Sequence, residues 1–100
     1  MKNLLILFTV VAAQITYSQI NEDGLESDAD IAIFYYNSGI DKIEIEDYKN
    51  ALIDFDKAIS FNPKDADFYS NRAYVKGELE NFIGAIEDYT IAIILAPNEA

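Results

Sequence analysis

The stretch ALIDFDKAI at residues 51–59, with a proline at position 63, returns as AIEDYTIAI at residues 85–93, with a proline at position 97. The same shift of 34 residues relates many positions of the chain without any gap. Ala32, Phe34, Tyr35, Asn37, Lys42, Glu44, Glu46, Ala51, Asp54, Ala58, Ile59 and Pro63 recur as Ala66, Phe68, Tyr69, Asn71, Lys76, Glu78, Glu80, Ala85, Asp88, Ala92, Ile93 and Pro97. A fixed period of this length is typical of stacked supersecondary units, none of which can bury its apolar face alone.

Each repeated unit is predicted to be a pair of helices. The four helices are expected at residues 31–42, 48–61, from 65 or 67 to 78, and 82–96. In the second of them, intervals of three and four put Leu52, Phe55 and Ile59 on one apolar face, with Asp54 elsewhere. The expected helix caps are Ser27 in a capping box with Asp30, then Asp47 and Asn81. The predicted fold is all-α, with two stacked antiparallel helix-turn-helix units.

Composition limits the chemistry that the chain can perform. The 100 residues include no cysteine and no histidine, which excludes disulfides and thiolate zinc sites and removes the commonest metal ligand and general base. No metal or cofactor is therefore expected. The formal net charge of -11 repels phosphate backbones, so nucleic acid is an unfavourable partner.

The first residues are typical of a secretory signal peptide. Lys2 precedes an apolar run from Leu4 to Ala13, and polarity then rises, which predicts a leader at residues 1–18 cleaved after Ser18 or earlier, near Ala13. The alternative is an uncleaved anchor over residues 3–21, against which the polar residues of its second half count. The mature chain is expected in the periplasm or outside a bacterial cell, with no stable membrane insertion after removal of the leader.

Residues 19–31 are predicted to be an acidic linker. Part of it resembles a calcium-binding loop, but its first and last ligand positions hold Gln19 and Asp30, where Asp and Glu are required. A solvated linker is the favoured interpretation.

The two units resemble tetratricopeptide repeats, at residues 32–65 and 66–99. The family pattern of alternating aromatic and small residues closed by a proline is met by Tyr35, Gly39, Tyr48, Ala51, Phe55, Ala58 and Pro63, and again by Tyr69, Ala73, Phe82, Ala85, Tyr89, Ala92 and Pro97. Ser38, Arg72, Lys42 and Lys76 depart from that pattern. The basic stems are expected to cover apolar surface while their charges stay in water.

The resemblance implies that the first helix of each unit lines a concave groove for a peptide or helix. By register, the groove positions are Ile33, Tyr36, Asn37, Ile40 and Ile43 in the first unit, and Asp67, Ser70, Asn71, Tyr74 and Glu78 in the second. A peptide with hydrophobic side chains and a positive charge suits them. Alternatively, Ile40, Ile43 and Tyr74 pack between helices. The family's carboxylate clamp is not supported, because Tyr36 and Asp67 stand where it needs lysines.

The last helix is apolar nearly all round. Its outer side carries Thr90, Ile91 and Ile94, where the first unit has Asp56, Lys57 and Ser60. Because the terminal helices of such arrays are normally polar on that side, either a third repeat or another chain is expected to cover it, and a homo-oligomer is one such arrangement. Ile91 and Ile94 are therefore predicted partner contacts.

These features together predict an exported scaffold or adaptor that binds a protein or peptide and is not an enzyme. The alternative is an amino-terminal interaction segment of a larger envelope protein, an enzyme or transport component, whose activity lies beyond residue 100. A carboxylate-based enzyme using Asp54 with Asp56, or Glu87 with Asp88, is disfavoured, because those pairs do not share a helix face and solvated helix surfaces account for them.

Overall fold

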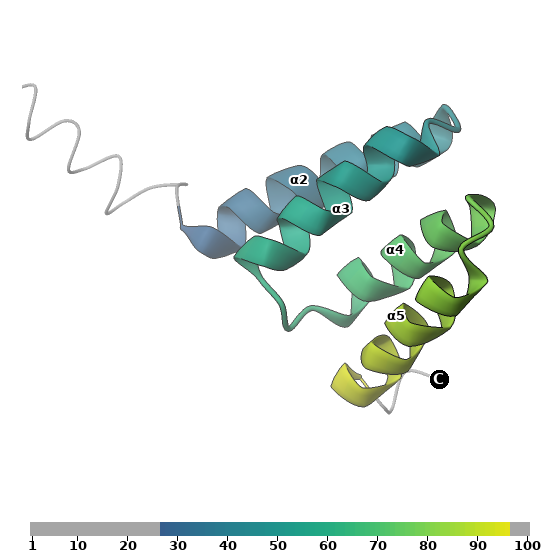
Figure 1. The fold of residues 1–100 in the computed structure, drawn as a ribbon. Coiled ribbons are helices and arrows are strands. Elements are labelled where there is room, and N and C mark those ends of the chain that lie inside the picture. The colour runs from purple at the N-terminus through teal and green to yellow at the C-terminus, as the bar shows by residue number, and fades with distance from the viewer. Residues whose placement is uncertain (1–26, 97–100) are drawn as a thin grey trace, which may run out of the picture.

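The computed structural model describes residues 27–96, and all the secondary structure in this range is helical. The elements are α2 (Asp28–Glu44), α3 (Tyr48–Phe61), α4 (Ala66–Glu78) and α5 (Phe82–Leu95) (Figure 1). They confirm the all-α prediction, and α2 begins three residues earlier than expected. The predicted leader and most of the predicted linker lie outside the described residues.

Short polar side chains set the start of each helix. The Ser27 hydroxyl accepts a hydrogen bond from the Asp30 amide at 3.2 Å, and the Asn81 side chain accepts one from the Gly84 amide at 3.0 Å. Asp47 caps α3 in the same way. Of the two residues that could start the third helix, Asp65 is the cap, since its carboxylate accepts from the Asp67 amide at 3.0 Å. Each cap satisfies an amide that the helix itself leaves without a partner.

Both hairpin turns close in the same backbone geometry. Glu46 follows α2 with φ 59°, and Glu80 follows α4 with φ 65°. In the first turn the Glu46 amide donates to the Ile43 carbonyl and the Asp47 amide to the Lys42 carbonyl; the second turn repeats both bonds 34 residues later. These paired bonds define a Schellman motif, in which glycine usually takes the left-handed position.

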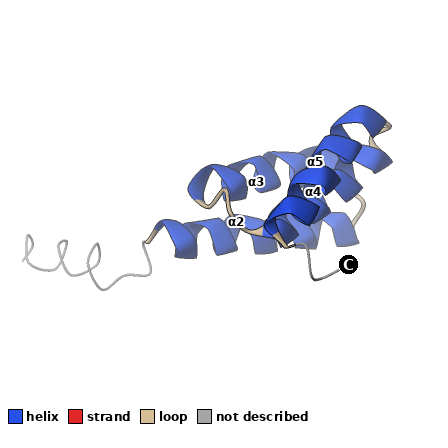
Figure 2. Ribbon diagram, turned by 90° about the horizontal axis from the view of Figure 1, so that it is seen from below, coloured by secondary structure: helices blue, strands red, loops and turns tan. Residues whose placement is uncertain are grey.

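The two hairpins stack through α3 and α4. Helices α2 and α3 pair, α4 and α5 pair, and α4 lies against α3 (Figures 1 and 2). Two buried clusters form the core: Ala32, Ala58 and Phe68 in one, and Ala51, Phe55 and Val75 in the other. Each cluster joins residues of the first hairpin to one residue of α4. Burying Phe55, Phe68 and Val75 contributes about 2 kcal/mol or more for each side chain.

A glycine allows the first hairpin to close tightly. A Cβ atom placed on Gly39 would lie 2.7 Å from Cε1 of Phe55, well inside the contact distance. The Phe55 ring therefore occupies the space that any larger residue at position 39 would need, and this close approach brings α2 against α3.

Candidate protein-binding surfaces

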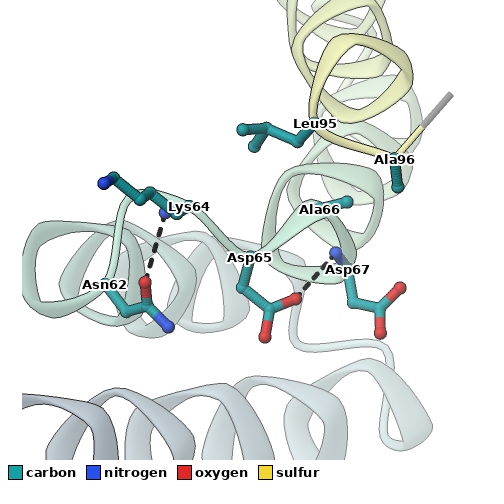
Figure 3. Close-up of a pocket in the computed structure, with 7 residues that line it drawn as sticks. All are labelled: Asn62, Lys64, Asp65, Ala66, Asp67, Leu95 and Ala96. Atoms are coloured by element: carbon teal, nitrogen blue, oxygen red, sulfur yellow. Dashed lines mark hydrogen bonds between the residues drawn. The ribbon is translucent and has the colours of Figure 1, made fainter.

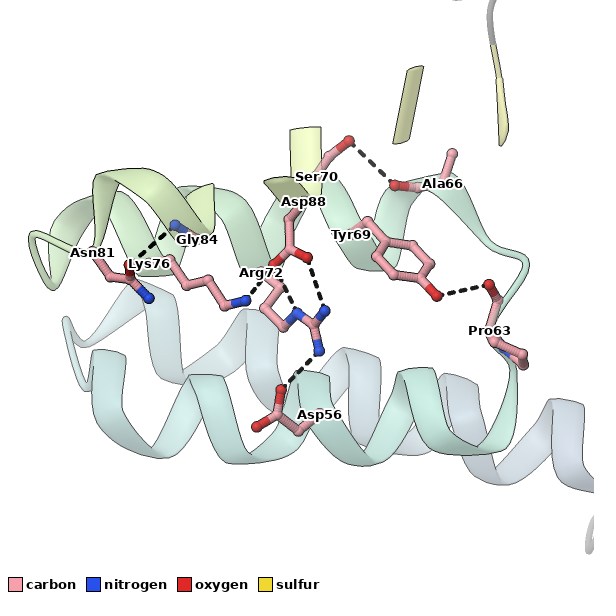
Figure 4. A network of polar contacts seen from close by, with 10 residues as sticks. All are labelled: Asp56, Pro63, Ala66, Tyr69, Ser70, Arg72, Lys76, Asn81, Gly84 and Asp88. Atoms are coloured by element: carbon pink, nitrogen blue, oxygen red, sulfur yellow. Dashed lines mark hydrogen bonds and ion pairs between the residues drawn. The ribbon is translucent and has the colours of Figure 1, made fainter. Parts of the chain in front are cut away.

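A buried carboxylate lies between the helices of each hairpin. Asp54 is 6% exposed and Asp88 is 2% exposed. Asp88 Oδ2 accepts from Arg72 Nε at 2.8 Å and lies 2.9 Å from Lys76 Nζ, while its Oδ1 accepts from Arg72 Nη2 at 2.8 Å (Figure 4). Burial by itself raises the pKa of Asp88, but the hydrogen bonds from Arg72 and Lys76 outweigh it and bring that pKa below its ordinary value.

The first hairpin holds the equivalent carboxylate with fewer charges. Asp54 Oδ2 accepts from Lys42 Nζ at 2.5 Å and from the Ser38 hydroxyl at 2.7 Å. Ser38 takes the place that Arg72 has in the second hairpin. Because Arg72 is longer, its Nη1 also reaches Asp56 of α3 at 2.9 Å, so that this one guanidinium connects the two hairpins (Figure 4).

The expectation of solvated positions for Asp54 and Asp88 is wrong. So is the expectation that the charges of Lys42, Arg72 and Lys76 simply stay in water, because all three bind these carboxylates. The physical reason is that a carboxylate can be buried when cations on the facing helix pair with it and satisfy its oxygens. A signal for this was present in the sequence: a lysine and an aspartate twelve residues apart recur together in both units.

The structure brings part of the predicted groove together where α2 meets α4. The Asn71 amide donates to the Tyr36 hydroxyl at 3.0 Å and to the Asp67 carbonyl at 2.9 Å. The Tyr36 ring stacks on Phe68 with centroids 4.9 Å apart. Burial first, and then the charges of Asp67 and Asp65, raise the pKa of Tyr36 above its ordinary value. The phenol therefore keeps its proton, and within the described residues this hydroxyl donates no hydrogen bond.

The exposed side chains around this pair define the surface, which we call the α2–α4 face. Its apolar members are Ile33, 50% exposed, and Tyr74, 41% exposed. Asn37 and Asp67 are also exposed. The Ser70 hydroxyl is used internally, since it donates to the Ala66 carbonyl at 3.2 Å (Figure 4). The face is thus apolar at two points and acidic at its α4 side.

Three predicted groove residues had two possible locations, the groove surface or the space between helices, and the structure places them differently. Ile40 and Ile43 pack against the cluster of Ala51, Phe55 and Val75, so they are mainly core residues. Tyr74 stays on the surface and its ring meets Tyr48 edge to face, with centroids 6.3 Å apart. Packing between helices therefore accounts for the two isoleucines and only in part for the tyrosine.

Helix α5 carries the second candidate surface. Large apolar side chains are exposed on several sides of it: Phe82, Ile83, Ile86, Tyr89, Ile91, Ile93, Ile94 and Leu95. Ile94 is 71% exposed, whereas Ile91 is only 36% exposed. Contiguous apolar exposure of this kind marks surfaces that bind protein or membrane.

A shallow hollow of about 330 Å³ lies beside the end of α5. It is lined by Asn62, Lys64, Asp65, Ala66, Asp67, Leu95 and Ala96 (Figure 3). Some of its polar groups already form hydrogen bonds within the connector between α3 and α4 (residues 62–65), where the Lys64 amide donates to the Asn62 side chain at 3.2 Å. The hollow thus combines an apolar wall from α5 with a polar wall from the α3–α4 connector.

Residues 27–96 include no group of three or more acidic side chains arranged to hold a metal ion. In the same range, no helix is both long and apolar enough to cross a bilayer. All buried side-chain nitrogen and oxygen atoms of this part of the chain have hydrogen-bond partners. The polar interior is therefore fully used by the fold, and the candidate surfaces are external.

Comparison of the sequence with models of known protein families gives no match, and a search of curated proteins finds no similar chain.

Proposed function

We propose that this chain is an exported, non-enzymatic scaffold of the tetratricopeptide-repeat type, which binds a segment of a partner protein on its α2–α4 face. The observation that carries the proposal is the combination of fixed polar groups and exposed apolar side chains on that face. Asn71 donates to the Tyr36 hydroxyl and leaves its proton available, and Ile33 of α2 and Tyr74 of α4 expose apolar surface. The two stacked hairpins and their 34-residue period support the family assignment.

The chemistry of the face specifies the kind of segment that it binds. Ile33 and Tyr74 offer contacts to apolar side chains, and the Tyr36 hydroxyl can donate to a backbone carbonyl of the partner. The exposed carboxylate of Asp67, close to Tyr36, favours a lysine or arginine of the partner at that end. The proposed ligand is accordingly an extended or helical segment with spaced apolar residues and one positive charge.

Site-specific photocrosslinking tests this proposal. A photoreactive phenylalanine analogue replaces Ile33 or Tyr74 in the full chain, produced in cells of its source. We expect each position to give a discrete adduct with a protein other than the chain itself, identified by mass spectrometry. Asp67→Lys should reduce the adduct yield several-fold by repelling the partner's cation.

The control position is Lys49, an exposed residue of α3 that is not on the α2–α4 face. Equal adducts from position 49, or none from positions 33 and 74, would contradict the proposed binding face.

A further inference from the structure

The junction between the two hairpins shows how one unit of this chain docks on another. Helix α4 and its C-cap residue meet α3 through a stripe of four residues: Phe68, Arg72, Val75 and Leu79. Phe68 packs with Ala58 of α3, and Val75 packs with Ala51 and Phe55 of α3. On the receiving side, α3 contributes a stripe formed by Tyr48, Leu52, Phe55, Asp56 and Ile59.

Helix α5 carries the receiving stripe again, and no residue between 27 and 96 covers it. The residues 34 positions after those of α3 are Phe82, Ile86, Tyr89, Thr90 and Ile93. Phe82 is 63% exposed, Ile86 66% and Ile93 60%, whereas their α3 equivalents are all partly buried. We call these five residues the α5 stripe.

Helix α2 and its C-cap residue carry the docking stripe again, and within the described part of the chain nothing covers it. The residues 34 positions before those of α4 are Phe34, Ser38, Asp41 and Ile45. Phe34 is 67% exposed, although its equivalent Phe68 is 2% exposed, and Ile45 is 73% exposed. We call these four residues the α2 stripe. It is separate from the α2–α4 face, to which Ile33 and Asn37 belong.

We propose that the α5 stripe of one molecule binds the α2 stripe of a second copy, head to tail, in the way that α3 binds α4. The inference concerns surfaces other than the α2–α4 face, so it does not depend on the proposed function. Because the two stripes differ, the contact is heterologous, and a row of copies has one free α2 stripe at one end and one free α5 stripe at the other.

Residues that meet across the junction within the chain have changed together at the two free stripes. Asp56 and Arg72 form an ion pair at 2.9 Å, and their equivalents are Thr90 and Ser38, so both members of this pair are replaced by uncharged residues. Phe55 and Val75 share a cluster, and their equivalents are Tyr89 and Asp41. In the proposed contact, the hydroxyl of Tyr89 in one molecule can therefore donate a hydrogen bond to the carboxylate of Asp41 in the second copy.

The second hairpin also has a place for the aromatic ring of Phe34. Phe68 is seated against Ala32, Ala58 and Ile59, whose equivalents are Ala66, Ala92 and Ile93. Ala66 lines the hollow beside the end of α5 (Figure 3). Ile93 is 60% exposed and Ala66 is half-buried, whereas Ala92 is buried, so the seat that Phe68 fills in the first hairpin is only partly accessible in the second, and its three side chains are small or apolar.

The first experiment measures solution mass against concentration by light scattering on the processed product of the full sequence. We expect the mass of the unaltered chain to rise beyond that of a dimer. Ile86→Ser with Ile93→Ser should weaken association by about tenfold or more, and so should Phe34→Ser with Ile45→Ser. Circular dichroism should show the same helix content in all samples, because these side chains are mostly exposed.

The matched control is Ile83→Ser with Ile94→Ser. These residues of α5 are 75% and 71% exposed, but their equivalents Lys49 and Ser60 are solvent-exposed and lie outside the α3 stripe. The control pair should associate like the unaltered chain. A loss of association equal to that of the Ile86 and Ile93 pair would overturn the proposal, as would an unaltered chain that stays monomeric because another segment or partner covers α5.

Mixing the two interface variants tests the head-to-tail direction. The α5-stripe variant keeps its α2 stripe, and the α2-stripe variant keeps its α5 stripe. At a concentration where the unaltered chain associates and neither variant does so alone, an equimolar mixture is expected to form a dimer with one molecule of each kind and nothing larger. A mixture that remains monomeric would overturn the proposal. A dimer that forms only in the mixture excludes a symmetric α5-to-α5 contact, because one of the two molecules has no intact α5 stripe.

Discussion

Asp88 and Asp54 occupy equivalent positions but have different electrostatic surroundings. Asp88 binds the guanidinium of Arg72 through both of its oxygens and Lys76 through one, and the cationic side chains are 17% and 18% exposed. Asp54 has one cation, Lys42, whose side chain is 33% exposed. Removing the charge of Asp88 leaves Lys76 without its carboxylate and Arg72 with Asp56 alone, so the loss of stability should be larger than at Asp54, where only Lys42 is affected.

Replacing Asp88 by Asn should accordingly lower the free energy of unfolding by about 3 kcal/mol at pH 7, and Asp54→Asn by about 1 kcal/mol. Urea titrations followed by circular dichroism measure both values. Similar losses in the two variants would show that the extra cation contributes little.

The same residue predicts an acid dependence. The pKa of Asp88 is lowered in the folded chain, so the stability that its charge provides is complete above the unfolded pKa of about 4 and is lost as pH falls through the folded value. The difference in stability between the unaltered chain and Asp88→Asn should therefore shrink below about pH 4. Urea titrations between pH 7 and pH 2 check this, and a constant difference would contradict it.

At the scale of the elements, the two turns contain residues that the backbone does not favour. Glu46 and Glu80 adopt left-handed backbone angles, where a Cβ atom costs about 1 kcal/mol and glycine costs nothing. The chain tolerates the cost because each turn gains the two hydrogen bonds of its Schellman motif.

Glu80→Gly should therefore raise the free energy of unfolding by about 0.5 to 1 kcal/mol. The control is Glu78→Gly in the last position of α4, which has an ordinary helical backbone and should lose up to about 1 kcal/mol. Thermal unfolding of the three chains compares them, and a loss at both positions would count against relief of backbone strain at Glu80.

Sequence patterns predict some features of these elements and miss others for physical reasons. Caps and helix spacing depend on neighbouring residues, so the starts at Ser27, Asp47 and Asn81 could be read directly. The turn geometry could not, because no glycine or asparagine marks positions 46 and 80. The sequence also could not show which groove residues belong to the core and which to the surface. Ile40 and Ile33 are the same residue type, and only the packing of Ile40 against the cluster that contains Phe55 distinguishes it from exposed Ile33.

For the whole molecule, the strong negative charge opposes the contact between copies. The chain has a formal charge of -11, and the two stripes that meet are mainly apolar, so attraction comes from burial and repulsion from charge. Salt reduces only the second of these, because it screens charges over a Debye length of about 10 Å at 0.1 M.

Association should therefore strengthen when the salt concentration rises from about 0.02 M to about 0.3 M. Sedimentation equilibrium at both salt concentrations measures the change, with the Ile86→Ser and Ile93→Ser chain as a control that remains monomeric in both. Association that weakens with salt would indicate that ion pairs, not apolar contacts, hold the copies together.

Arg72 also determines where such a row of molecules separates. Its guanidinium joins Asp56 of the first hairpin to Asp88 of the second, so the two hairpins lose this shared anchor together when either one opens. Ser38 and Thr90 offer no such anchor between neighbouring copies. In the proposed row, dilution or mechanical load should consequently release whole molecules before it separates the two hairpins of any one molecule, so that the assembly would come apart and re-form without unfolding its members.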